Sequence, residues 1–153
     1  MPGKLLYALH VLGAVLWVGG MAFAILVLRP ALASLEPAQR LALHQGILAR
    51  FFRLVWHAMP IVLVSGWVLL FGWYGGFRGV GWHVHVMHLS ALIMAAVFLG
   101  IVTGPWRAFR AAMARGDTAG AAAAANSVRQ LVTANLVLGL LTVAIAAWGR
   151  FGG

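Results

Sequence analysis

Six histidines are the residues most able to do chemistry in this chain, because few other reactive side chains are present. The chain has no cysteine and only two acidic residues, Glu36 and Asp117. The absence of cysteine excludes disulfides, iron–sulfur clusters and thiol catalysis. Both carboxylates are expected in the loops between spans, so they leave no acid–base pair for hydrolysis. Any metal must therefore be bound by histidine or methionine, and any redox chemistry would come from a cofactor.

Three of the histidines are expected at similar depth near one face of a membrane. His10 lies five residues into the first long apolar segment, while His85 and His88 lie at the start of the third. Two imidazoles that project from facing helices at equal depth can occupy both axial positions of a haem b. We expect His10 and His88 to be the preferred pair, with His85 as the alternate ligand.

The surroundings of His10 also suit a flat macrocycle. Gly13 and Trp17 follow His10 at helical spacing, so a small residue lies directly beneath the imidazole. Lys4 and Arg78 are available on the same side for the haem propionates. Small residues at such positions also serve ordinary helix packing, so both interpretations stay open.

Copper is the alternative ligand. The spacing His83-x-His85-x-x-His88, with Met87 beside it, combines imidazole and thioether groups that suit copper. In a helix, however, His83 and His85 point about 200° apart, so all three histidines converge only if the helix starts after His83. His57 lies near the opposite face, where it would cap backbone carbonyls freed by Pro60 or bind a second metal or haem.

The composition requires these residues to be held by membrane helices. Of 153 residues, 63% are hydrophobic and 8% are charged, whereas soluble domains are about 25% charged. A spanning helix needs about 20 apolar residues, and four segments qualify: 5–28, 54–73, 84–102 and 131–148. We predict an all-α integral membrane four-helix bundle, with residues 1–153 forming a single transmembrane domain.

The distribution of basic residues predicts the orientation of this bundle. Most of them lie in or beside the two loops that follow the first and third segments, and only Lys4, Arg78 and Arg150 lie on the other side. The positive-inside rule then predicts both termini outside, in a multi-pass protein of a bacterial inner membrane. The net charge of +9 therefore reflects topology rather than nucleic-acid binding. Ser34 and either Asp117 or Thr118 are good N-cap residues, so both loops should carry cytoplasmic helical extensions.

Two patterns concern how the helices pack. Residues 9–14 resemble residues 87–92, which sets His10 beside His88, as two parallel helical hairpins related by an axis along the membrane normal would. Asn135, Gly139 and Thr142 form a polar stripe on the fourth segment, where we expect hydrogen bonds between helices.

Several segments resemble a known group of membrane proteins. Residues 8–20, which read ALHVLGAVLWVGG, resemble the first helix of copper-resistance D-like (CopD) proteins and of the similar HemJ-type protoporphyrinogen oxidases. The likeness extends to residues 50–53 and 135–141. It implies a four-helix fold in which His10 helps to hold haem b, with redox chemistry on a porphyrin or a quinone-like partner. HemJ-type proteins carry a lysine in the third helix where this chain has Met87, so the resemblance does not extend to protoporphyrinogen oxidation.

Three functions follow from the sequence. The first is a haem-b membrane protein that transfers electrons near the periplasmic face, with a quinone, a porphyrin or a periplasmic protein as its redox partner. The second is copper binding or transport of the CopD type. The third is a non-catalytic membrane subunit whose small-residue faces dock against a partner or a second copy of the chain.

Overall fold

The computed structural model describes residues 2–151, and every regular element in that range is helical. Four helical rods of 33 to 36 residues are long and apolar enough to cross a membrane. This confirms the predicted all-α fold with four spans. Three of the predicted spans lie inside one rod each, and the predicted span 54–73 ends one residue beyond the second rod, which ends at Gly72. The bounds of the main helices are α1 Pro2–Ala22, α2 Arg29–Ala31, α3 Pro37–Gly72, α4 Trp82–Thr103, α5 Pro105–Ala114 and α6 Thr118–Arg150.

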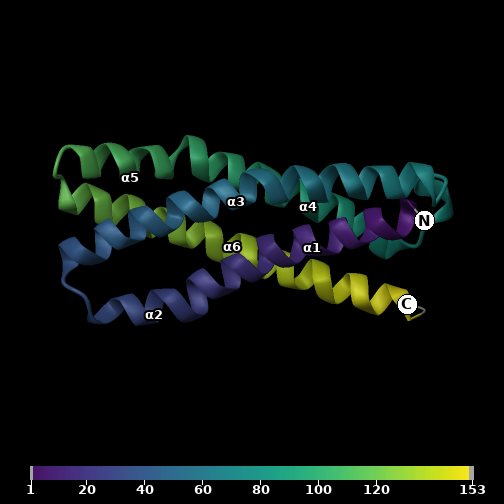
Figure 1. The fold of residues 1–153 in the computed structure, drawn as a ribbon, viewed down its shortest axis with the longest axis horizontal. Helices are drawn as coiled ribbons and strands as arrows, with labels where there is room; N and C mark the ends of the chain where they lie inside the picture. Colours follow the sequence, from purple (N-terminus) through teal and green to yellow (C-terminus); the bar gives the residue numbers. More distant parts are fainter. Residues whose placement is uncertain (1, 152–153) are drawn as a thin grey trace.

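The rods lie side by side and form a bundle with two distinct ends (Figure 1). Both termini and the turn between α3 and α4 lie at one end, which we call the histidine end (residues 2–10, 73–88 and 142–151). The turns between α2 and α3 and between α5 and α6 lie at the other, which we call the arginine end (residues 29–53 and 103–129). A helix of this length spans about 50 Å, compared with about 30 Å of hydrocarbon, so the rods extend beyond the apolar layer. Which end faces the cytoplasm stays a prediction.

Prolines determine where the first and third rods deviate from regular α-helix. Pro30 has no N–H to donate to the carbonyl of Leu26, and the turns before it widen into a π-helix, Phe23–Leu28, in which the N–H of Arg29 bonds to Ala24. In the third rod, Gly104 breaks the helix and Pro105 starts α5.

The two predicted N-caps have different outcomes. Asp117 caps α6, because its side chain accepts a hydrogen bond from the N–H of Gly120 at 2.8 Å. Ser34 does not cap a helix: its hydroxyl donates to Ala31, and α3 begins only at Pro37. The prediction for Ser34 is wrong because Pro37, whose fixed φ favours the first helical position, moves the start of the helix.

The rods pair into two hairpins, since α1 packs mainly on α3, and both α4 and α5 pack on α6. The buried positions of the two hairpins correspond at one constant offset along the chain. Gly13, Trp17, Val18 and Met21 of α1 match Ser90, Met94, Ala95 and Phe98 of α4, while Val55, Ala58, Met59 and Val62 of α3 match Val132, Asn135, Leu136 and Gly139 of α6. The predicted repeat is therefore supported, but its register was one residue out, because this offset places His10 opposite Met87.

The polar stripe on α6 forms the predicted hydrogen bonds between helices. The amide of buried Asn135 donates to the carbonyl of Met94 at 3.3 Å, and the hydroxyl of Thr142 contacts that of Ser90 at 2.8 Å. Gly139 allows close packing, because a Cβ there would lie 3.0 Å from a methyl group of Val18. These contacts join α6 to both α4 and α1.

The outer surface of the rods is apolar, as lipid contact requires. Large side chains such as Leu12, Val15 and Leu26 are each at least 59% exposed. In water such a surface would be an aggregation hazard, whereas in a bilayer it is the normal exterior. The chain is therefore a multi-pass membrane protein in contact with the lipid bilayer.

Candidate metal site

His10 projects from α1 onto α3, where two groups hold one side of its ring. Its Nδ1 lies 3.0 Å from the carbonyl oxygen of Val62 and 3.0 Å from the hydroxyl oxygen of Ser65. A carbonyl only accepts, so this geometry assigns the proton to Nδ1 and leaves Nε2 with a free lone pair. Metal-binding histidines usually have their second nitrogen held in this way.

Gly66 makes this approach of His10 to α3 possible. A Cβ on Gly66 would lie 3.0 Å from Cε1 of His10, closer than ordinary side-chain contacts. Neither Ser65 nor Gly66 was predicted from the sequence to hold His10. A signal was present, since Ser65 is the one hydroxyl-bearing residue in the predicted span 54–73 and a glycine follows it.

His88 brings a second imidazole from α4. Its Nε2 is buried and has no hydrogen-bond partner. The ring meets Trp67 and Phe77 edge-on, with ring centroids 5.5 Å and 5.3 Å apart. His88 is also an electrostatic neighbour of His10, so the structure brings the predicted pair into one region at the histidine end.

The other two histidines of the α4 cluster have separate environments. His85 is exposed, stacks on Phe77 with centroids 5.3 Å apart, and is an electrostatic neighbour of His88. His83 lies instead against Gly149 of α6, where a Cβ would overlap its ring. Because α4 already starts at Trp82, His83 and His85 leave the helix in different directions. Within residues 2–151, no three histidine or acidic side chains are grouped closely enough to hold a metal ion.

The helix face below His10 is filled by protein. Gly13 is buried, and a Cβ there would lie 2.8 Å from a methyl group of Val62. Trp17 is 3% exposed and belongs to the hydrophobic core. This geometry is that of close helix packing between α1 and α3.

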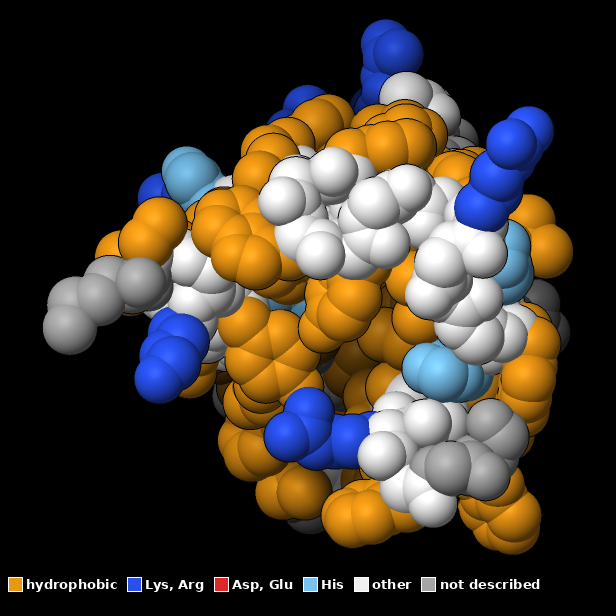
Figure 2. Space-filling model, turned by 90° about the vertical axis from the view of Figure 1, so that its right-hand side faces the viewer, with side chains coloured by type: hydrophobic (Ala, Val, Ile, Leu, Met, Phe, Trp, Pro, Cys, Tyr) orange, Lys and Arg blue, Asp and Glu red, His pale blue; other side chains and the backbone are white. Residues whose placement is uncertain are grey.

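The histidine end has a central hollow with apolar walls, and histidine and basic side chains lie around it (Figure 2). By their positions at the ends of the rods, the basic residues of this end are Lys4, Arg78 and Arg150. Both acidic residues, Glu36 and Asp117, lie at the arginine end, and no acidic side chain is visible in this view. The candidate site therefore combines imidazole side chains with a positive rim.

His57 does not join the pair. It is exposed on α3, and its Nδ1 lies 2.7 Å from the carbonyl oxygen of Arg53, one turn earlier. It precedes Ser65 by about two turns, or roughly 12 Å, toward the arginine end. The carbonyl that Pro60 leaves without a donor is that of Trp56, so this contact with Arg53 is not the predicted capping interaction.

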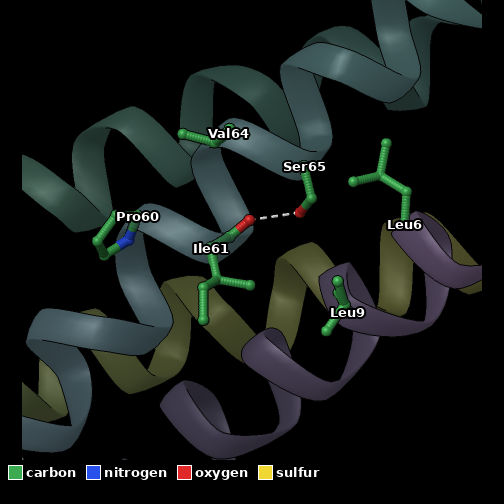
Figure 3. A pocket seen from close by; sticks show the side chains of 6 residues that line it. All are labelled: Leu6, Leu9, Pro60, Ile61, Val64 and Ser65. Atoms are coloured by element: carbon green, nitrogen blue, oxygen red, sulfur yellow. Dashed lines mark hydrogen bonds between the residues drawn. The ribbon is translucent and has the colours of Figure 1, made fainter.

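A shallow groove of about 360 Å³ lies on the lipid side of the same helices. Figure 3 shows its lining, formed by Leu6 and Leu9 of α1 and by Pro60, Ile61, Val64 and Ser65 of α3. The only side-chain hydroxyl in this lining is that of Ser65, which donates to the carbonyl of Ile61. The groove is apolar and offers no metal ligand, but its wall is shared with the residue that holds His10.

Comparison with protein families identifies the class of this membrane bundle. The family model of copper resistance protein D (CopD) matches residues 45–149, more than half of the chain. The chain belongs to this family, which confirms the CopD resemblance. No match was found among curated proteins or solved structures. The matched range includes His57, His83, His85 and His88 but not His10, and the likeness to HemJ-type proteins stays a prediction.

Proposed function

We propose that this protein binds copper at the histidine end of its bundle, as an ion that it handles rather than a permanent cofactor. The observation that carries the proposal is the pair of His10 and His88, with Nδ1 of His10 held by α3 and Nε2 of His88 buried without a partner. Imidazole nitrogen is a good copper ligand. Membership of the copper resistance protein D family supports copper over other metals.

Two nearby side chains are candidates for a further ligand. Met87 precedes His88 on α4 and would add a thioether, which favours copper(I), whereas His85 would add a third imidazole. Lys4, Arg78 and Arg150 add positive charge to the rim, so we propose that copper arrives bound to an anionic carrier rather than as a free cation. In the proposed orientation this rim faces the periplasm of a bacterial cell.

The same histidine pair would also supply both axial ligands of a haem b. The sequence predicts a macrocycle beneath His10 because Gly13 and Trp17 follow it at helical spacing. In the structure, Gly13 packs against α3 and Trp17 lies in the hydrophobic core. Because protein fills the helix face below His10, this packing favours copper over haem at the site. An electron-transfer role with a quinone, a porphyrin or a periplasmic partner depends on the haem alternative.

The test is a copper(I) titration of the detergent-purified protein against a coloured chelator, together with an absorption spectrum before and after reduction. We expect one copper ion per chain. Replacing either histidine (His10→Ala or His88→Ala) should weaken binding more than the about 10- to 100-fold that loss of an outer-shell partner costs. His57→Ala is the matched control and should bind normally. A b-type haem spectrum that both site variants abolish would instead establish the haem alternative.

A further inference from the structure

We propose a second, independent site at the arginine end, where Arg29, Arg40 and His44 bind a phosphate group. The three side chains come from the two arms of the first hairpin. Arg40 and His44 lie one turn apart on α3, and Arg29 is the first residue of α2. Both arginines are electrostatic neighbours of the half-buried His44.

Arg40 is already held in place. One terminal nitrogen of its guanidinium donates to the carbonyls of Ala33 at 2.9 Å and Leu35 at 2.8 Å, which closes the turn before α3. Its Nε is buried and has no hydrogen-bond partner. A guanidinium fixed in this way loses little further freedom when it binds an oxyanion, and it retains an unused donor.

The local charge is unbalanced. The one acidic residue near the cluster is Glu36, which is exposed at the position before α3. A single carboxylate does not neutralise two guanidinium groups. A phosphate group carries the charge and the several acceptor oxygens that such a cluster would bind.

A π-helical turn in the backbone directly precedes Arg29. The π-helical turn Phe23–Leu28 immediately precedes Arg29 and changes the direction in which its side chain leaves the rod. π-Helical turns are rare and occur often at functional sites. Arg29 also directly follows the apolar segment 5–28. Its position is therefore at the edge of the hydrocarbon layer, where lipid headgroups lie. The phosphate of an anionic lipid is therefore one source of the ligand, and free phosphate is the other.

The experiment measures lipid retention and phosphate binding on the full-length protein. Native mass spectrometry counts molecules of phosphatidylglycerol or phosphatidylcholine of equal chain length that the protein retains, and inorganic phosphate is titrated in a thermal-shift assay. The variants are Arg29→Gln and His44→Gln. Arg115→Gln is the control, since it removes one charge from the same end at the α5–α6 turn. Arg40→Gln is avoided because Arg40 also closes the turn.

Two results would support the site. If wild type retains phosphatidylglycerol over phosphatidylcholine and Arg29→Gln weakens this about tenfold, the loss expected for a charged hydrogen bond, the ligand is a lipid headgroup. If phosphate raises the melting temperature of wild type but not of Arg29→Gln, with no preference between lipids, the ligand is a free anion. The proposal is overturned if neither ligand binds selectively, or if Arg115→Gln weakens binding as much as Arg29→Gln.

Discussion

Gly66 determines how closely His10 can approach α3, so replacing Gly66 should disturb the proposed copper site without removing any ligand. A Cβ at this position would lie 3.0 Å from Cε1 of His10, whereas ordinary contact begins at 3.4 Å. The ring must therefore move away by about 0.4 Å. The 3.0 Å contact of its Nδ1 with the carbonyl of Val62 would then lengthen beyond the usual range of about 2.7 to 3.2 Å.

We expect Gly66→Ala to weaken copper(I) binding about tenfold, the lower end of the cost of losing an outer-shell partner of a metal-binding histidine. Gly66→Val should weaken it further. The assay is the chelator titration on protein purified in detergent. Gly100→Ala is the matched control, because Gly100 also lies within a helix but has no neighbouring atom within 4 Å of its would-be Cβ. Both alanines gain similar helix propensity, about 1 kcal/mol. Equal copper affinity in the two variants would refute the argument.

Three further predictions follow from the helix ends and the topology. Gly149→Ala should lower the melting temperature, because the new Cβ overlaps the ring of His83, and circular dichroism during heating would measure the change. Asp117→Ala removes the cap of α6 and should cost about 1 kcal/mol of stability, measured by chemical unfolding. The chain has no natural cysteine, so Tyr74→Cys in whole cells should react with a membrane-impermeant maleimide while Ser34→Cys should react only after lysis.

Each of these tests has its own control. Gly19→Ala adds a methyl group in open space and gains helix propensity, so it should not lower the melting temperature. Asp117→Asn keeps an acceptor oxygen and should retain most of the cap. The reverse labelling pattern of the two cysteine variants would mean that the arginine end faces outward, which would invert the proposed orientation of the copper site.

The sequence was sufficient to predict the spans, because twenty apolar residues in a row have few other structures available. It also predicted the contacts of Asn135 and Thr142, since polar side chains inside a span need partners. It did not predict that Ser65 and Gly66 hold His10. The rods are apolar on nearly every side, so the spacing of apolar residues along the sequence does not indicate which helix face packs against which neighbouring helix.

The repeat shows the same limitation. An error of one residue rotates a helix position by about 100°, and similarity among apolar residues cannot distinguish adjacent registers. Only the burial pattern determines the offset, and it sets His10 opposite Met87 rather than His88.

That constant offset is the relation expected between two copies of one ancestral hairpin. Two identical hairpins related by a two-fold axis would present the same residue at equivalent positions on both sides of the axis. A site on the axis would then have identical ligands from the two halves. In the present chain the position that carries an imidazole in the first half carries a thioether in the second. If the two hairpins are copies, their equivalent positions therefore offer different ligand chemistry, an imidazole at His10 and a thioether at Met87.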